Sequence, residues 1–196
     1  MIIAFTGAGI SKASGIPTFD EQGDLRTKLD RDFARHYPKE FNKIMQQLKD
    51  TCAAAEPNDA HKALAEYNVP VITMNIDGLH IRAGSEHVVE VHGSVKENNV
   101  VLYGDAAPKY TEAIDIVDRM CQDDILLIVG TSFYTSISSQ IKYTAEANWS
   151  QVIIINDDAE HQVRQFLEEN KNSLGNYDEF MKRLPSWKYN LLPYDY

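Results

Sequence analysis

Cysteine is scarce in this 196-residue chain, which has only Cys52 and Cys121. Two thiols cannot form a four-thiolate zinc site or a disulfide framework, so we expect no metal centre and two reduced thiols. No apolar run approaches the roughly 20 residues of a membrane span. The first residues also lack the basic-then-apolar pattern of a signal peptide. The sequence therefore predicts a cytoplasmic protein with no membrane partner.

Basic residues are also few, with 19 Lys and Arg against 29 Asp and Glu, which gives a formal charge of −10. Such an acidic balance works against a large phosphate-binding surface, so we expect no nucleic-acid partner. The composition is otherwise that of a globular protein, with 43% hydrophobic and 24% charged residues. It excludes collagen-like, coiled-coil and wholly disordered chains.

The apolar residues gather in short unbroken runs of strand length. Continuous runs indicate strands that are buried on both faces, as in a parallel sheet covered by helices. The predicted strands are residues 2–5, 69–73, 100–103, 125–129 and 152–155.

Helical patterns separate these runs. We expect helices from Pro38 to Thr51, from about Pro57, from Pro108 to about Asp123, and after a cap at Asp157 or Asp158. This alternation predicts a doubly wound α/β fold with a Rossmann-like parallel sheet. We assign residues 1–196 to a single domain, with a polar cofactor loop and a small helical insertion at about 18–66. The aromatic tail, residues 175–196, is expected to pack as a strap on the surface.

Residues that could bind a ligand or take part in catalysis follow the predicted strands, where ligands bind in open α/β sheets. After the first strand, Gly7 and Gly9 allow a tight turn, and a helix opening near Ile10 would point backbone amides at a diphosphate. Lys12 stands where the ordinary dinucleotide fingerprint has a glycine, and no Walker loop is present. A plain tight turn therefore stays an alternative to nucleotide binding.

Further polar residues follow the other strands. Asn75 and Asp77 are two positions apart and can face the same ligand, but from these residues alone an Asx turn that closes the strand is the favoured interpretation. His92 follows Val88-Val89-Glu90-Val91, at the mouth of the next strand, and has the imidazole of a general base. His80 and His87 raise a metal-site alternative, but no matching cysteine or carboxylate pattern accompanies them. The last group offers donors for a phosphate or ribose: Gly130, Thr131, Ser132 and Asn156.

Taken in order, these segments resemble the signature of the sirtuin family over roughly the first 160 residues. The matching segments are Gly7-Ala8-Gly9-Ile10-Ser11, Ser14-Gly15-Ile16-Pro17 with Phe19, Asn75-Ile76-Asp77-Gly78-Leu79-His80, Glu90-Val91-His92-Gly93-Ser94, Val100-Val101-Leu102-Tyr103-Gly104-Asp105, Val129-Gly130-Thr131-Ser132 and Ile155-Asn156.

The resemblance implies an NAD-dependent protein-lysine deacylase. Such an enzyme splits the nicotinamide–ribose bond of NAD and passes ADP-ribose to the carbonyl of an acyl-lysine protein or peptide, releasing lysine, nicotinamide and O-acyl-ADP-ribose. By this analogy His92 would deprotonate a ribose hydroxyl, and Asn75 would order the nicotinamide ribose and its water. Asp77 and the Ile76 backbone would hold the carboxamide, and Phe19 would shield the reactive carbon.

The same resemblance implies the remaining contacts to the cofactor, NAD. Ala8, Gly9 and Ser11 would hold the diphosphate. Thr131, Ser132 and Asn156 would hold the phosphate and the adenine ribose. The implied catalytic set is His92, Asn75 and Asp77. The implied cofactor-binding set is Gly7, Ala8, Gly9, Ser11, Pro17, Phe19, Asn75, Ile76, Asp77, His92, Gly130, Thr131, Ser132 and Asn156.

The sequence departs from the family pattern in three ways. Only residues 95–99 separate Ser94 from Val100, so the zinc ribbon that supports the acyl-peptide cleft is absent. Asp20 stands where the family has arginine, and Met74 stands where it has glutamine. These departures keep two alternatives open: an NAD glycohydrolase or ADP-ribosyltransferase, and a non-catalytic module that binds NAD or ADP-ribose.

Overall fold

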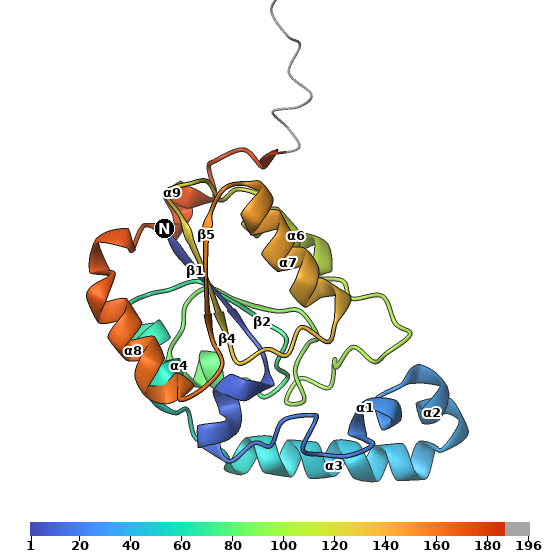
Figure 1. Cartoon of the computed structure of the whole chain (residues 1–196). Coiled ribbons are helices and arrows are strands. Elements are labelled where there is room, and N and C mark those ends of the chain that lie inside the picture. The colour runs from blue at the N-terminus through green and yellow to red at the C-terminus, as the bar shows by residue number, and fades with distance from the viewer. Residues whose placement is uncertain (187–196) are drawn as a thin grey trace, which may run out of the picture.

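A five-stranded parallel sheet forms the centre of the protein. The computed structural model describes residues 1–186. The strands are β1 (Ile2–Thr6), β2 (Val71–Thr73), β3 (Val88–Glu90), β4 (Ile125–Val129) and β5 (Gln151–Ile155). Their order is β3-β2-β1-β4-β5, and each neighbouring pair is parallel (Figure 1). The predicted doubly wound sheet is confirmed, and its strand order reverses between β1 and β4.

One predicted strand is wrong. Residues 100–103 form no strand of the sheet, and the third sheet strand is β3, just before His92. Only Tyr103 makes an isolated parallel bridge, to Asp30, and Leu102 packs on neighbouring helices instead of the sheet. The apolar run was misread because burial against helices selects the same residue types as burial in a sheet.

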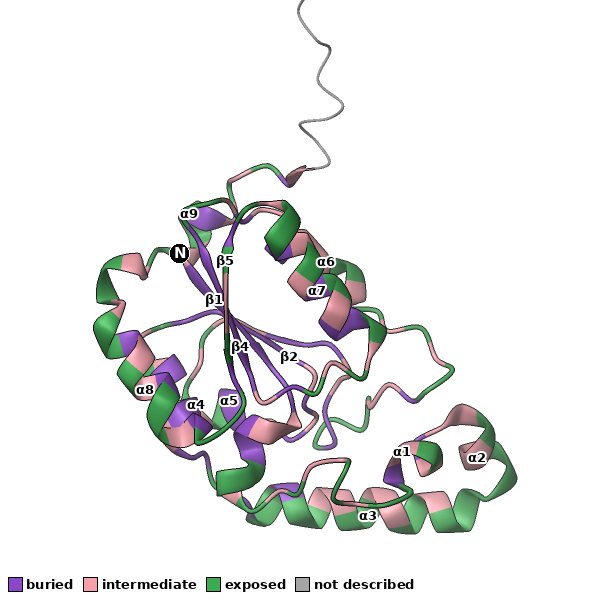
Figure 2. Cartoon of the chain, in the orientation of Figure 1, coloured by how far each residue is buried: buried purple, intermediate pink, exposed green. Residues whose placement is uncertain are grey.

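Helices cover both faces of the sheet (Figures 1 and 2). On one side lie α4 (Asp59–Glu66), α5 (Leu79–Ala83) and α8 (Ala159–Glu169). On the other side lie α6 (Tyr110–Val117) and α7 (Ser136–Ala147). The short elements η2 (Lys171–Ser173) and α9 (Tyr177–Phe180) follow α8.

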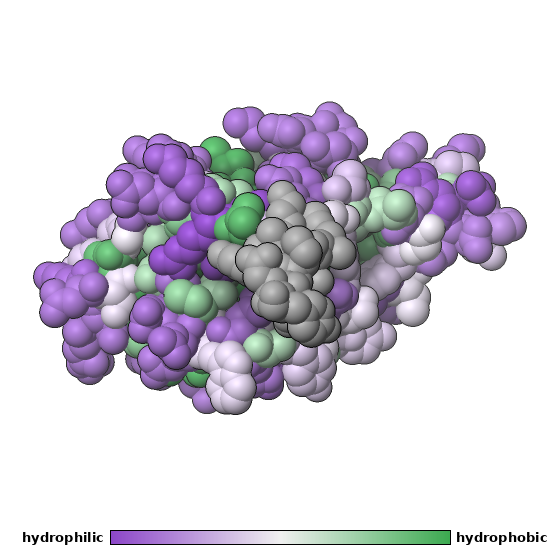
Figure 3. All heavy atoms as spheres, turned by 90° about the horizontal axis from the view of Figure 1, so that it is seen from above, coloured by the Kyte–Doolittle hydropathy of each residue, from purple (hydrophilic) through white to green (hydrophobic). Residues whose placement is uncertain are grey.

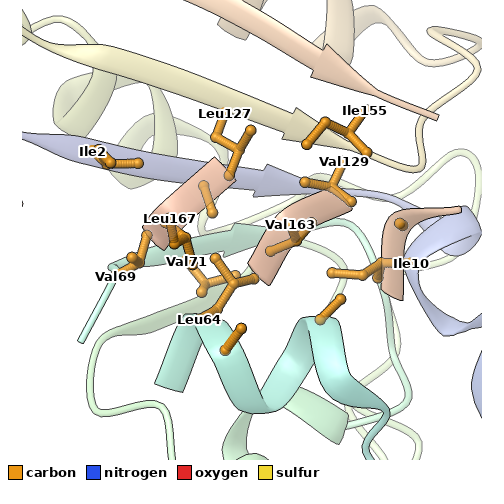
Figure 4. Close-up of a cluster of buried hydrophobic side chains, with 14 of the residues drawn as sticks. Ile2, Ile10, Leu64, Val69, Val71, Leu127, Val129, Ile155, Val163 and Leu167 are labelled. Atoms are coloured by element: carbon orange, nitrogen blue, oxygen red, sulfur yellow. The ribbon is translucent and has the colours of Figure 1, made fainter. Parts of the chain in front are cut away.

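The two faces carry separate apolar cores. Figure 4 shows Leu64 of α4 and Val163 of α8 packed toward β1, β2 and β4. Leu64, Leu127 and Val163 are fully buried. Each such side chain stabilises the fold by about 1.5–3 kcal/mol. The sheet is therefore a rigid platform for the loops at its carboxyl end.

Two helix starts differ from the sequence-based expectation. The helix after Gly7 is a 3₁₀ helix, η1 (Ala8–Ser14), which begins two residues before the predicted opening near Ile10. Asp158 occupies the cap position of α8, but its carboxylate contacts His161 and caps no backbone N–H. By contrast, Asn58 caps α4 by accepting hydrogen bonds from the backbone N–H groups of Ala60 and His61.

A small helical unit lies beyond the carboxyl ends of the strands (Figure 1). It consists of α1 (Leu25–Lys28), α2 (Arg31–His36) and α3 (Pro38–Ala54). Leu25, Leu29 and Leu102 form its buried centre. Leu102 belongs to the segment after His92. Because Leu102 packs against Leu25 and Leu29, the helical unit and this segment together form one wall beyond the carboxyl ends of the strands.

Seen from the side of α9, the visible face is mostly hydrophilic, with separate small apolar patches (Figure 3). Among residues 1–186, no helix is both long and apolar enough to cross a membrane. Of the predicted aromatic strap, Tyr177 packs against His87. The other aromatics on which the strap rested, Trp187, Tyr189, Tyr194 and Tyr196, lie outside the described residues.

Candidate active site

A cavity of about 650 Å³ lies at the carboxyl ends of the strands, between the sheet and the helical unit. That volume is within the usual range of ligand pockets. Most of the residues predicted from the sequence line it: Ala8, Gly9, Phe19, Asn75, Ile76, His92, Gly130, Thr131, Ser132 and Asn156. Four predicted residues are absent from its wall: Gly7, Ser11, Pro17 and Asp77.

The glycine turn after β1 is packed against the end of β4. The Gly9 N–H donates to the Gly130 carbonyl oxygen at 2.8 Å. A Cβ atom on Gly9 would lie 2.6 Å from the Cα of Gly130, and Gly130 has φ +64°. Glycine is required at both positions because the two backbones touch here. This contact fixes the floor of the cavity at the point where the strand order reverses.

Ser11 joins the two polar residues that follow β2. Its hydroxyl donates to Asp77 Oδ2 at 2.8 Å and accepts from Asn75 Nδ2 at 3.1 Å. Asp77 Oδ1 accepts from the Leu79 N–H at 2.9 Å, which is the hydrogen bond of an Asx turn. Burial raises the pKa of Asp77 above its ordinary value. Asn75 and Asp77 thus face one partner, but Asp77 lies behind the wall that Asn75 lines.

His92 lies on the cavity wall, half buried, two residues after β3. Burial lowers the pKa of its imidazole. A lowered pKa keeps the ring neutral at pH 7, with a lone pair that can accept a proton. The position and the protonation state are both those of a general base.

The turn of residues 95–99 closes directly behind His92. Asn99 Oδ1 accepts from the Ser94 N–H at 2.7 Å, and the His92 carbonyl accepts from the Val101 N–H at 2.9 Å. Residues 1–186 contain no group of three or more His, Cys, Asp or Glu side chains placed to hold a metal ion. Beside His92 the wall is held by the Asn99 side chain and by the backbone hydrogen bond between Val101 and His92.

The far end of the cavity joins β4 to β5. The Thr131 N–H donates to Asn156 Oδ1 at 3.1 Å, so the two predicted residues contact each other across neighbouring strands. Met74, one of the departures from the family pattern, accepts a hydrogen bond from the Thr135 hydroxyl through its sulfur at 3.2 Å. The Met74 thioether thus serves as the hydrogen-bond partner of Thr135 at the edge of the site.

Sequence reasoning missed a cation and an aromatic residue at the cavity. The Arg26 guanidinium lies 3.9 Å from the ring centroid of Tyr134 and pairs with Asp20 at 3.0 Å. The carboxylate at position 20 is thus neutralised by an arginine six residues later. A single Arg in a polar stretch of the sequence gives no signal, because only the fold brings it to the cavity.

A parallel sheet with this strand order and a cavity at its switch point defines the Rossmann-like class of nucleotide-binding proteins. The model of the Sir2 family matches residues 7–99. An NAD-dependent protein deacylase 2 from Archaeoglobus fulgidus is 32% identical over 79% of this chain and 79% of its own length. An NAD-dependent protein deacetylase from Bacillus cereus is 29% identical over 95% of this chain and 92% of its own.

Solved structures agree with these relatives. The structure of a Sir2 homolog–NAD complex matches with a TM-score of 0.77 and 21% identity, over 89% of this chain and 90% of that chain. Sir2 bound to an inhibitor, 2′-O-acetyl-ADP-ribose and a deacetylated p53 peptide matches with a TM-score of 0.72 and 25% identity, over 87% and 94%. The chain belongs to the Sir2 family, the sirtuins.

Proposed function

We propose that this protein is an NAD-dependent protein-lysine deacylase, which cleaves NAD to nicotinamide and forms O-acyl-ADP-ribose. The observation that carries the proposal is that one cavity joins the turn after β1 with Asn75, His92 and Asn156. A base, an amide and a set of small donors around one space are what cleavage of a glycosidic bond and transfer to an acyl oxygen require. The relatives named as NAD-dependent deacetylases and deacylases support the same activity.

NAD supplies a nicotinamide–ribose bond that can be broken. In our proposal the phosphate and adenosine end lies along Ala8, Gly9, Thr131 and Ser132, with Asn156 beside them. Backbone N–H groups and small hydroxyls bind phosphate and ribose oxygens without a net positive charge. This suits a chain with a formal charge of −10.

Asn75 and His92 act at the reacting ribose in this proposal. The amide nitrogen of Asn75 is committed to Ser11, so its oxygen is free to accept from a ribose hydroxyl or an ordered water. His92 accepts the proton of a ribose hydroxyl, which makes that oxygen a nucleophile toward the acyl group. Both side chains line the cavity, so both reach a bound ligand.

The nicotinamide end lies at Ile76, with Asp77 directly behind the wall. The carboxylate of Asp77 attracts the cationic pyridinium of NAD, and the Ile76 backbone can hold the carboxamide. Phe19, Leu29 and Leu102 line the apolar side, which suits the aliphatic chain of an acyl-lysine and excludes water from the reacting carbon.

The proposal also places the protein in the cytoplasm, where NAD and acylated proteins occur together. Its two cysteines are free thiols, as is usual in a reducing compartment.

The experiment follows nicotinamide release from NAD with and without an acetyl-lysine peptide. Release that requires the peptide and yields O-acetyl-ADP-ribose is the expected result. Release without the peptide would instead support the glycohydrolase or transferase alternative. Binding of NAD with no release under either condition would identify a non-catalytic binding module.

A further inference from the structure

A buried polar layer behind the cavity has no part in the proposed function. His61 and His80 are 0% and 2% exposed, and their ring centroids lie 4.8 Å apart. Burial lowers the pKa of His61 to about 4 and that of His80 well below its ordinary value. Two adjacent imidazoles in a dry interior disfavour any positive charge on either ring. Both rings are therefore neutral at physiological pH.

Asn58 fixes where the proton of His61 lies. Asn58 Oδ1 accepts from the Ala60 N–H at 3.0 Å, and Asn58 Nδ2 donates to the Ile10 carbonyl at 2.7 Å. The amide oxygen is thus the atom that lies 3.0 Å from His61 Nδ1, so Nδ1 must carry the hydrogen. His61 Nε2 is left with a lone pair.

That lone pair faces Ser11. His61 Nε2 lies 3.4 Å from Ser11 Oγ, and Asp77 Oδ2 lies 2.8 Å from the same atom. The one hydroxyl proton of Ser11 therefore has two possible acceptors. When Asp77 is a carboxylate, the proton points to Asp77. When Asp77 takes one proton from solvent, its new O–H donates to Ser11, and the Ser11 proton turns to His61.

We propose that Ser11 and His61 form a hydrogen-bond relay. The relay gives Asp77 a partner in both its charged and its neutral form, and so sets the pH at which Asp77 loses its charge. This inference rests on the proposed function. It adds that the charge of Asp77 decides how much more tightly the site binds NAD, with its cationic nicotinamide end, than ADP-ribose. Only one proton is added at Asp77, no heavy-atom bond changes, and His61 stays neutral. His61 is a positioning residue that acts through Ser11.

Other titratable or charged groups face Asp77 from the surrounding elements. Arg82 of α5 favours its carboxylate form, and Glu90 of β3 and the Cys52 thiol of α3 are also close enough to interact. His92 titrates on the cavity wall. His92 faces the ribose that NAD and ADP-ribose share, so the ratio of the two affinities removes most of its effect.

The test measures binding of two ligands to the full chain by calorimetry. The first is carbocyclic NAD, which keeps the pyridinium cation but cannot be cleaved, and the second is ADP-ribose. Burial raises the pKa of Asp77, so carboxylate is lost as pH falls through that raised value. Carbocyclic NAD should then weaken about tenfold per pH unit below the midpoint, whereas ADP-ribose should not follow this titration.

Variants at His61 isolate the relay. His61→Phe removes the acceptor that supports protonated Asp77, so the midpoint should move down by about one pH unit, and carbocyclic NAD should bind about tenfold tighter than to the unmodified protein at the acid end. His61→Gln keeps an acceptor and should keep the original profile. The exposed His161, changed to Phe, is the matched control.

Several outcomes would overturn the relay. One is a His61→Phe variant that weakens both ligands equally at every pH, as a merely structural role would. Another is identical behaviour of the Phe and Gln variants. If His61→Phe does not fold, calorimetry of the unmodified protein in buffers of different ionisation enthalpy decides, because carbocyclic NAD should release a proton near the midpoint and ADP-ribose should not. If neither ligand binds the unmodified protein, the proposed function itself fails.

Discussion

The imidazole at position 92 offers the most direct test at the scale of a single residue. Burial lowers its pKa, so its neutral form persists to a lower pH than the usual value of about 6.5. The acid limb of kcat/KM should therefore lie below that value, with activity lost as pH falls through the lowered pKa. His92→Ala should reduce deacylation by about 10²–10⁴-fold and remove this limb, because the proposed base is gone. A pH series of kcat/KM on acetyl-lysine peptide measures both effects.

The control for this prediction is His36→Ala. His36 is exposed on α2, so the change should leave the profile as it is. Normal turnover by His92→Ala across the pH range would show that another group is the base.

Single residues also show where sequence reasoning ends. Asn75 and His92 could be predicted because each follows a strand, and strand ends meet at one edge of a parallel sheet. The orientation of Asp77 could not, because its partner Ser11 is 66 positions away in the chain. The side chain of His61, which lies beside Ser11, is fully buried. Its contact with Ser11 needs the packing of α4 against η1, which no local pattern encodes.

At the scale of elements, the contact between the turn after β1 and the end of β4 should be the least tolerant point of the site. A Cβ atom on Gly130 would lie 2.2 Å from the Ile10 nitrogen, a backbone atom that cannot move away alone. Gly130→Ala should cost about 1–2 kcal/mol for its left-handed backbone and about 1–3 kcal/mol more for the clash. Chemical denaturation monitored by circular dichroism measures the loss.

Gly23 provides the matched control because it has φ +61° with no atom within 4 Å of an added Cβ. Gly23→Ala should therefore show only the backbone cost. Equal losses in the two variants would mean that the turn and β4 can separate, and that the floor of the cavity is not fixed by this contact.

The misassigned strand is informative at the same scale. Residues 100–103 are apolar, but Leu102 packs with Leu25 and Leu29 of the helical unit. Arg31 Nε donates to Asp105 Oδ1 at 2.8 Å, which ties α2 to the end of this segment. Periodicity reports that a segment is buried but not what buries it, so helix and sheet partners could not be distinguished from the sequence.

At the scale of the whole molecule, the parallel sheet was predictable, apart from the wrong strand at residues 100–103, because β1 and β4 are buried along their full length. The edge strand β5 is only partly buried, with Gln151 and Ile154 exposed, but its register with β4 is complete. The cavity volume and the placement of α1, α2 and α3 were not predictable, because they depend on long-range packing around Leu102. The assignment of residues 1–196 to one domain stays a prediction.

The way the helical unit is held leads to a prediction about metal dependence. Behind His92 the wall is closed by Asn99, and beyond it by the packing of Leu102 and the contact of Arg31 with Asp105. These contacts are hydrogen bonds and apolar packing, so incubation with a zinc chelator should leave both the melting temperature and the peptide-dependent release of nicotinamide unchanged. A zinc-ribbon relative treated in parallel should lose both, because structural zinc contributes its binding energy directly to folding. Thermal unfolding with and without chelator measures the difference, and a clear fall in the melting temperature of this protein would mean that a metal ion holds the wall after all.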